Sequence, residues 1–331
     1  MQAQLIALDW GTTSLRAYRL GEHGQVLQQR ALSAGIMQLP QTPRLIAGEL
    51  CSDGFELALD EACGDWLNAE PDLPVIACGM VGSAQGWREA PYRETPASVH
   101  ELGAALESVR SVRGVTVHIV PGVLQRSTLP NVMRGEETQV LGVLASLSPE
   151  QAGQPLLIGL PGSHSKWVDV AQGQIRHFDT FMTGEVYAAL CAHTILGRTM
   201  HRGDGFDDAA FDRGLEIALS ASGAAGPLST IFSTRTLGLT GQLDPAAQPD
   251  YLSGLLIGHE LAVLAAQRRT SSPSIVLIGN DALCARYSRG LAAAGFSRIA
   301  LAEQATERGL WQVAVEAGLV PGASTTLSNE V

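Results

Sequence analysis

Short apolar runs alternate with glycine-rich turns at the start of the chain, and this pattern predicts a β-meander. The runs are rich in β-branched and aromatic side chains, which favour strands, and turns such as 21–24 separate them. Longer stretches with apolar positions three and four residues apart predict helices. In the first half we expect strands at 4–9, 14–20, 25–29, 75–78 and 117–120, and helices at 44–68 and 133–147.

The second half begins with the same order of elements as the first. The segment "LLIGLPGSHSKWVDVAQGQIRHF" parallels "LIALDWGTTSLRAYRLGEHGQVL", with Gly162 in the place of Gly11 and Ser163 in the place of Thr12. Helices then follow at 185–196, 208–220, 251–268 and 282–294, with a strand at 275–278. A repeated order of elements at the starts of two halves predicts a duplicated meander-plus-helix domain.

The boundary between the halves is expected at 147–154, where the chain becomes polar and carries Pro and Gly. The sequence therefore predicts an α/β protein with two domains, 1–150 and 151–331.

Composition narrows the class of protein. The chain has 331 residues, of which 45% are hydrophobic and 17% charged, and this supports a large buried core. Its net charge of −11 at pH 7 argues against a nucleic-acid partner, because phosphate backbones are bound through an excess of lysine and arginine. Small anions can still bind where a few basic groups and backbone N–H groups converge.

Cysteine usage and hydropathy indicate the compartment. The five cysteines are scattered without a CxxC pair, so they suggest neither a disulfide framework nor a zinc site. There is no signal-like N-terminal stretch, and no apolar run reaches the roughly 18 to 20 residues of a membrane span. We expect a cytoplasmic protein without a membrane partner.

The turn after the first strand carries candidate phosphate-binding residues. Gly11 lets the chain approach a ligand closely, and Thr12 and Thr13 supply hydroxyl and N–H groups. Asp9, at the end of the strand, is a candidate ligand for Mg²⁺, which takes one or two carboxylates together with phosphate oxygens. The alternative is an ordinary hairpin whose Asp bonds its own turn amides.

A matching turn, "GLPGSHSKW", opens the second half. Gly162, Ser163, His164 and Ser165 offer backbone donors and hydroxyls, and Lys166 adds positive charge for clustered phosphates. A solvated Ser-rich turn is the alternative. Two such turns facing each other would clamp a polyphosphate.

The stretch "NVMRGEETQVLG" places two glutamates at the start of a helix. Acidic residues are favoured there by the helix dipole, so plain capping is one interpretation. In the other, a glutamate, Glu136 or Glu137, accepts the proton of a hydroxyl that attacks a phosphoryl group. Arg134 is then the first candidate to pair with a substrate carboxylate, with Arg16 and Lys166 as alternatives.

Two further glycine-containing stretches are candidate binding loops. Residues 77–92, "ACGMVGSAQGWREAPY", could line a sugar site or form an aromatic-anchored loop. Gly279 and Asn280, between a strand and a helix, could admit a flat adenine or ribose, although such turns are common. The substrate-binding candidates in the first stretch are Met80, Gly82, Ser83 and Trp87.

Taken in order, DWGTT, NVMRGEETQ, LPGSHSKW and IGN before a helix resemble the sugar kinases of the actin, heat-shock and hexokinase-like superfamily. The words AGIMQLP, ACGMVGSAQGW, MTGE and LSGLLIG extend the likeness over nearly the whole chain. They are most similar to the 2-dehydro-3-deoxygalactonokinase family. This resemblance implies two RNase H-like domains around a cleft, bound ATP and Mg²⁺, and transfer to the terminal hydroxyl of a 2-oxo-3-deoxy sugar acid.

The resemblance also implies roles for the candidate residues. Asp9 would organise the metal, 11–13 and 162–166 would hold the phosphates, and 279–280 would meet the adenosine. Related sugar kinases carry Gly-Asp where this chain has Gly135-Glu136, so the role of base passes to Glu136, with the adjacent Glu137 as the alternative.

Other functions are compatible with the same motifs. The chain could phosphorylate another sugar or sugar acid, because a nucleotide motif does not fix the acceptor. It could also be an ATP-binding, actin-like assembly protein that closes on nucleotide and contacts partners. A homodimer is a further expectation, since the apolar helix around 251–266 suits either a core or a dimer face.

Overall fold

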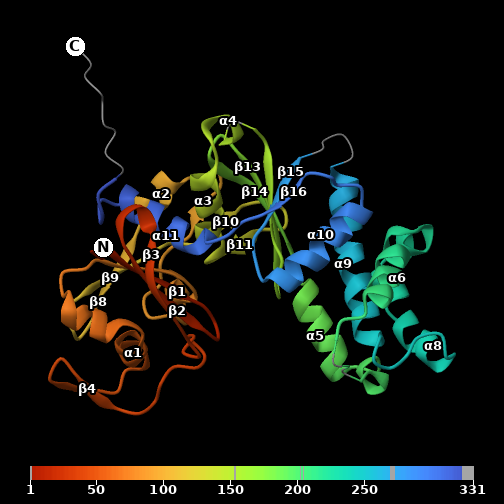
Figure 1. The fold of residues 1–331 in the computed structure, drawn as a ribbon, viewed down its shortest axis with the longest axis horizontal. Helices are drawn as coiled ribbons and strands as arrows, with labels where there is room; N and C mark the ends of the chain where they lie inside the picture. Colours follow the sequence, from red (N-terminus) through yellow and green to blue (C-terminus); the bar gives the residue numbers. More distant parts are fainter. Residues whose placement is uncertain (1, 153, 202, 204, 269–272, 323–331) are drawn as a thin grey trace. The chain divides into compact units, whose positions relative to one another are not determined.

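The computed structural model describes residues 2–152, 154–201, 203, 205–268 and 273–322. It divides into two units (Figure 1). Unit 1 comprises Met1–Gln154, Val170–His177 and Glu303–Val331, and unit 2 comprises Pro155–Asp169 and Phe178–Ala302.

Unit 1 is built on a six-stranded sheet with the order β3-β2-β1-β6-β9-β8. β1 pairs antiparallel with β2 and parallel with β6, so the predicted meander is confirmed. In this register Asp9 lies between Arg16 and Cys78. The strands are β1 Leu5–Trp10, β2 Leu15–Leu20, β3 Val26–Leu32, β6 Val75–Gly79, β8 Glu107–Arg110 and β9 Thr116–Ile119.

Helices cover both faces of this sheet. On one face Ile6, Leu8 and Trp10 are buried in one cluster with the apolar side of α1 (Gly54–Ala69). α11 (Ala305–Glu316) contacts β1 and β6 and packs on α3 (Glu136–Ser146) and α2 (Val99–Gly103). α3 and α11 approach so closely that a Cβ on Gly142 would stand 1.8 Å from the carbonyl oxygen of Ala305.

Smaller elements complete unit 1. A three-stranded sheet contains β7 Arg93–Glu94, β10 Val123–Gln125 and β11 Asn131–Met133. Ala97 forms an isolated bridge with Ile175, which joins 170–177 to this unit. The remaining elements are α4 Pro149–Ala152 and the 3₁₀ turns η1 Glu22–Gly24 and η2 Met80–Gly82.

Unit 2 contains most of a five-stranded sheet with the order β14-β13-β12-β15-β16. In both sheets the first strand is flanked on one side by the second and third strands of its half and on the other side by later strands. β15 is parallel to both β12 and β16. The strands are β12 Leu156–Leu160, β13 Ser165–Ala171, β14 Gln174–Phe181, β15 Ser274–Leu277 and β16 Ile299–Leu301.

The helices of unit 2 pack around α9, which contacts α5, α6, α7, α8 and α10 (Figure 1). Glycines allow α6 and α9 to touch through their backbones, since a Cβ on Gly254 would lie 2.0 Å from the carbonyl oxygen of Phe211. The helices are α5 Thr183–His193, η3 Gly197–Thr199, α6 Asp208–Leu219, η4 Ala221–Ala225, α7 Pro227–Thr230, α8 Ser233–Leu239, α9 Gln248–Gln267 and α10 Asp281–Ala293.

The predicted helix at 44–68 is wrong in its first ten residues. A hairpin of β4 Arg44–Ile46 and β5 Glu49–Cys51 occupies eight of them, Ser52 and the capping Asp53 follow, and the helix begins at Gly54. Asp53 sets this start, because its side chain accepts from the N–H groups of Phe55 and Glu56 and so caps the helix. The other predicted helices and strands are present, with ends that differ by a few residues.

The division into units differs from the expected domains because two segments of the expected second domain, Val170–His177 and Glu303–Val331, belong to unit 1. The expected second domain, 151–331, ended with the chain, whereas α11 belongs to unit 1. The packing of α11 on α3 and β1 explains this return, since its buried Leu310 and Val313 find their apolar partners there.

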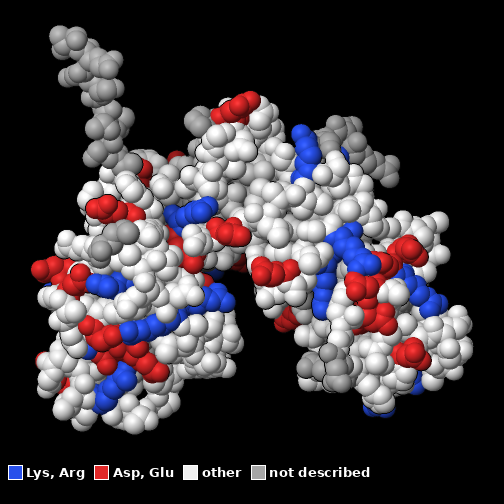
Figure 2. Space-filling model, viewed as in Figure 1, with Lys and Arg blue, Asp and Glu red and all other residues white. Residues whose placement is uncertain are grey.

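On the face shown in Figure 2, Lys and Arg side chains are interspersed with Asp and Glu among the described residues. Ion pairs join charges of opposite sign in the structure, for example Arg289 with Asp208 and Asp212. Among the described residues, no helix is both long and apolar enough to cross a membrane.

Candidate active site

The turn after β1 presents N–H groups that have no acceptor in the described part of the chain. The carbonyl oxygens of Gly11 and Thr12 accept from the N–H groups of Ile36 and Met37, at 3.1 and 3.0 Å, and these bonds hold the turn against the loop that follows β3. The N–H groups of Thr12 and Thr13 remain free within the described residues, and both side chains are exposed. Such a turn can bind an anion.

Asp9 lies just before this turn, and its side chain is 19% exposed. Arg16 donates to its Oδ2 atom at 3.1 Å. Burial raises the pKa of Asp9, and the charge of Arg16 opposes this rise. Burial, and after it the nearby Asp9, also raise the pKa of Glu307 on α11. One oxygen of the Asp9 carboxyl group is thus held by a cation, and the other has no hydrogen-bond partner among the described residues.

The structure brings both glutamates of α3 to the same end of the sheet as Asp9. Gly135, just before α3, has φ +107°, a conformation that glycine adopts without strain, and a Cβ there would lie 3.2 Å from Gly79 Cα. Burial raises the pKa of Cys78 well above its usual range, and three nearby carboxylates, those of Asp9, Glu137 and Glu136, contribute to the rise. The three carboxyl groups therefore all act electrostatically on the thiol of Cys78, which lies next to Asp9 in the register of the sheet.

The two adjacent glutamates have different environments. Glu137 is completely buried, and its carboxyl oxygens accept from the N–H of Gly135, at 2.7 and 2.9 Å, and from the hydroxyl of Thr138 at 3.1 Å. Burial and the neighbouring Glu136 raise the pKa of Glu137 to about 8. Glu136 is only half-buried, and its Oε2 atom accepts from the N–H of Arg134 at 2.9 Å. Of the pair, Glu136 is the one that a ligand can reach.

The guanidinium of Arg134 is buried with unused donors. It is 9% exposed, donates from Nη2 to the carbonyl oxygen of Ala90 at 2.8 Å, and stacks over the ring of Tyr92 at 4.3 Å. Its Nε and Nη1 atoms, like the buried hydroxyl of Ser83, have no partner within the described residues. A Cβ on Gly82 would lie 3.0 Å from Nη1. Unpaired buried donors are costly, so this group is suited to an anionic partner.

Trp87 and Met80 occupy the same loop with different surroundings. Trp87 stacks on Phe55 with ring centroids 5.9 Å apart and meets the edge of Trp10 at 6.0 Å. The packing of Trp87 therefore matches the interpretation of 77–92 as a loop anchored by an aromatic side chain. Met80 is half-buried in the 3₁₀ turn after β6.

In unit 2, the turn after β12 is shorter than expected. Ser163 and His164 are exposed, and the N–H groups of Gly162, Ser163 and His164 have no acceptor in the described part of the chain. The prediction that Ser165 and Lys166 belong to the turn is wrong. β13 begins at Ser165, so both side chains are buried in the sheet, and the ammonium group of Lys166 donates to Thr180 at 2.9 Å.

The first turn of α5 lies directly against this turn. The N–H of Glu185 donates to the carbonyl oxygen of Ser163 at 3.0 Å, and the Glu185 carboxyl group contacts the imidazole of His164. A Cβ on Gly184 would lie 2.4 Å from the carbonyl oxygen of Gly162, so only glycine permits this approach. The positive end of the α5 dipole therefore adds to the anion-binding capacity of the turn.

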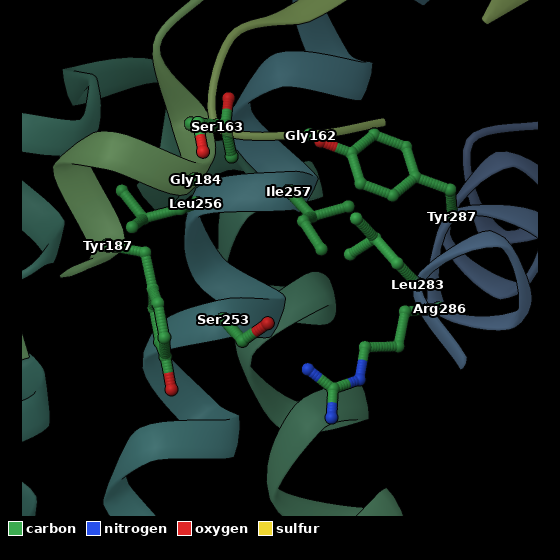
Figure 3. Close-up of a pocket in the computed structure, with 11 residues that line it drawn as sticks. Gly162, Ser163, Gly184, Tyr187, Ser253, Leu256, Ile257, Leu283, Arg286 and Tyr287 are labelled. Atoms are coloured by element: carbon green, nitrogen blue, oxygen red, sulfur yellow. The ribbon is translucent and has the colours of Figure 1, made fainter. Parts of the chain in front are cut away.

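A cavity of about 250 Å³ in unit 2 opens at the same turn (Figure 3). Gly162 and Ser163 lie at one end, and Ser253 and Arg286 at the other, with apolar side chains between them. The remaining lining residues are Thr183, Gly184 and Tyr187 of α5, Leu256 and Ile257 of α9, and Leu283 and Tyr287 of α10. A cavity with a polar turn at one end and apolar walls suits a planar ring that carries a charged group.

Gly279 and Asn280 do not line this cavity. The side chain of Asn280 caps α10, accepting from the N–H groups of Ala282 at 3.0 Å and Leu283 at 3.4 Å. The α10 residues that reach the cavity lie one and two helical turns beyond.

Several residues of the cavity escaped prediction because they are ordinary helical positions. Tyr187, Ser253, Arg286 and Tyr287 lie on three helices and meet only through packing. The sequence did contain one sign of a buried polar network beside the cavity. Glu260 is a single acidic residue inside the apolar run "LLIGHELAVL", and a charged residue in such a run points to a buried polar network.

Comparison with known proteins identifies relatives along nearly the whole chain. The family model described as 2-keto-3-deoxy-galactonokinase matches residues 9–313. A protein of Rhizobium meliloti named probable 2-dehydro-3-deoxygalactonokinase is 37% identical over 92% of this chain and 94% of its own length. The 2-dehydro-3-deoxygalactonokinase of Escherichia coli is 35% identical over 95% of this chain and 98% of its own length.

A solved structure is similar over the same extent. The crystal structure of a Sinorhizobium meliloti protein given the same enzyme name superposes with a TM-score of 0.81 at 34% sequence identity. It covers 94% of this chain and 98% of the other chain.

The raised pKa of Glu137 leads to a pH-dependent stability. Folded protein keeps the Glu137 proton up to about pH 8, whereas unfolded protein loses it near the ordinary value of 4.5. The stability that this proton confers is therefore present below about pH 4.5 and is lost as the pH rises through about 8.

We expect the melting temperature of Glu137→Gln minus that of the wild type to increase between pH 5 and pH 8 and then level off. Thermal unfolding between pH 5 and pH 9 measures this difference, with the exposed Glu61→Gln as control. Parallel curves for Glu137→Gln and the wild type would contradict the assignment.

Proposed function

The chain belongs to the 2-keto-3-deoxy-galactonokinase family, and we propose that it transfers the γ-phosphoryl group of ATP to the terminal 6-hydroxyl of 2-dehydro-3-deoxy-D-galactonate. It is accordingly a kinase, a phosphotransferase with an alcohol group as acceptor, in galactonate catabolism. Kinases for other sugars and assembly proteins are not favoured by these relatives.

The observation that carries the choice of acceptor is the position of Arg134 beside Glu136. A sugar acid has both a carboxylate and a hydroxyl, and these two residues offer a cation for the first and a proton acceptor for the second. The unpaired Nε and Nη1 atoms of Arg134 would gain an acceptor from the acid. A neutral sugar would leave them unpaired. Ser83, Gly82 and Met80 are proposed to contact the remaining polar groups of the acceptor.

In the proposed reaction Glu136 accepts the proton of the acceptor hydroxyl as its oxygen bonds to the γ-phosphorus. The bond between that phosphorus and the oxygen bridging to the β-phosphate breaks, and ADP leaves with the electron pair. Glu137 has a pKa of about 8 and is protonated at neutral pH. It therefore positions the start of α3 by binding the N–H of Gly135, and Glu136 acts as the base.

Backbone N–H groups are proposed to hold the phosphates. Thr12 and Thr13 supply one set, while the N–H of Gly11 donates to the carbonyl oxygen of Ser14 at 2.9 Å and holds the turn. Gly162, Ser163 and His164 supply the other set, supported by the N-terminus of α5. Fixed dipoles of this kind stabilise developing negative charge without reorganising. Ser165 and Lys166 then act from beneath the turn and do not touch the phosphates, while the cavity beside it receives the nucleoside.

The residues around Asp9 fit a hydrated Mg²⁺ ion. Among the described residues no three His, Cys, Asp or Glu side chains are grouped to hold a metal by themselves. Mg²⁺ commonly keeps several waters and takes one carboxylate with nucleotide phosphates. The Oδ1 atom of Asp9, for which the described residues provide no hydrogen-bond donor, suits that role. When bound with ATP, the ion would neutralise phosphate charge.

The two sheets support a wider proposal about the fold. Their equivalent strand order is consistent with duplicated RNase H-like domains. A cytoplasmic location and a homodimer also remain proposals from the sequence.

The reaction is tested by measuring ADP release with ATP and Mg²⁺. We expect strong stimulation by 2-dehydro-3-deoxygalactonate, and none by glycerol or without an acceptor. Equal rates with the gluconate-derived epimer would broaden the substrate. An ADP release that no acceptor stimulates would refute the kinase assignment.

The base assignment is tested by a pair of neighbouring substitutions. We expect Glu136→Gln to lower kcat by about 10²-fold or more with little change in either KM, because proton transfer is lost while binding is kept. Glu137→Gln should retain much more activity at pH 7, since the native side chain is neutral there. Steady-state kinetics compare the two variants, and the reverse order of effects would transfer the role of base to Glu137.

Recognition of the carboxylate is tested by Arg134→Lys. A lysine keeps the charge and loses the planar fork, so we expect the KM for the sugar acid to rise about tenfold or more while the KM for ATP is unchanged. The control is Arg126→Lys, since Arg126 is exposed and pairs with Glu94. An equal rise in both KM values would show a general distortion and contradict the assignment.

A further inference from the structure

Glu260 is a buried carboxyl group at the centre of unit 2. It lies on α9, is 3% exposed, and none of the turns proposed to bind phosphate contains it. Its Oε1 atom accepts from the indole N–H of Trp167 at 2.7 Å, and its Oε2 atom accepts from the hydroxyl of Tyr287 at 2.8 Å. The hydroxyl of Thr183 also donates to Oε2.

These three donors come from three different elements. Trp167 belongs to β13, the strand that continues directly from the Gly162–His164 turn. Thr183 is the first residue of α5, whose next residue, Gly184, contacts that turn. Tyr287 belongs to α10, and its ring lies beside that of Trp167 with centroids 6.2 Å apart. One carboxyl group thus ties together the strand, the helix start and the wall of the cavity.

The network extends to Ser165, at the base of the turn. The Ser165 and Tyr287 hydroxyl oxygens are 2.9 Å apart, and Tyr287 uses its single proton toward Glu260. Ser165 therefore donates to Tyr287, and both hydroxyls point in the direction that the carboxylate sets. Tyr287 lines the cavity together with Gly162 and Ser163 (Figure 3). Thr183 is also one of the lining residues.

We propose that Glu260 is a positioning residue for the nucleotide, holding the phosphate turn, the start of α5 and the cavity wall in their binding geometry. This inference rests on the proposed use of the cavity and turn for ATP. Glu260 acts through Trp167, Thr183 and Tyr287 and does not touch the nucleotide. Its loss should weaken binding of ATP and ADP while leaving the sugar acid unaffected.

The test substitutes Glu260→Gln in the full chain. The amide oxygen must face the indole N–H of Trp167, so the amide NH₂ group faces the hydroxyls of Tyr287 and Thr183. These hydroxyls then accept hydrogen bonds where they donate in the wild type. The direction of the hydrogen bond between Tyr287 and Ser165 is reversed as a consequence. We expect the dissociation constant for ADP, measured by titration calorimetry, to rise about tenfold. The KM for ATP should rise with it, and the KM for the sugar acid should stay within about twofold. The control is Glu216→Gln, an exposed glutamate on α6.

A second substitution keeps the test decisive if Glu260→Gln does not fold. Tyr287→Phe keeps the ring in the cavity wall and removes one donor to Glu260 together with its contact to Ser165, so a smaller rise in the ADP dissociation constant is expected. When both single variants fold, the loss of ADP affinity in the double variant should be smaller than the sum of the two single losses.

A lowered melting temperature with wild-type ADP affinity would show a merely structural role and overturn the proposal. Equal losses for ADP and the sugar acid, or a wild type that binds no ADP, would also overturn it.

The outcome is separable from that of the proposed function. ADP binding needs no acceptor, so a wild type that binds ADP but phosphorylates no sugar acid would refute the kinase assignment. The calorimetric comparison of Glu260→Gln with the wild type would still decide the role of Glu260.

Discussion

Each unit buries a glutamate close to its candidate ligand site, and the local backbone depends on satisfying it. Glu137 in unit 1 is completely buried, and Glu260 in unit 2 is 3% exposed. A carboxyl group removed from water is destabilising unless hydrogen-bond donors meet its oxygens. The N–H of Gly135 and the hydroxyl of Thr138 meet the first, whereas side chains from three elements meet the second. Because these hydrogen bonds must form, they fix the conformation of the backbone segments that carry the exposed candidate residues.

In both units a buried residue holds the backbone, and a more exposed neighbour is proposed to contact the ligand. In unit 1 the completely buried Glu137 binds the backbone N–H of Gly135, and its half-buried neighbour Glu136 is the residue proposed to act as the base. In unit 2 the buried Ser165 continues directly from the exposed Ser163 and His164. A residue that is fully bonded inside the protein cannot meet a substrate, but it restricts the position of the next residue. Adjacent residues of similar chemistry can therefore have different functions.

The sequence predicted the regular elements well where their periodicity was strong, as in the β1–β2–β3 meander and the helices of unit 2. It failed at 44–51 because apolar spacing continued through a hairpin, and only the Asp53 cap marks the true helix start. It gave no sign that α11 returns to unit 1, since that depends on the backbone contact between Gly142 and Ala305. Long-range packing leaves little trace in local spacing.

By itself the sequence determined the family, the two glycine turns and the acidic start of α3, because these features consist of neighbouring residues whose order is their signal. Only the tertiary structure decided which candidates are accessible. It exposes Ser163 and buries Lys166, and it assembles a cavity from three helices and the turn at Gly162 and Ser163. It also leaves two donor atoms of Arg134 without a partner among the described residues. Burial and the pairing of polar groups depend on segments far apart in the chain, and these meet only after folding.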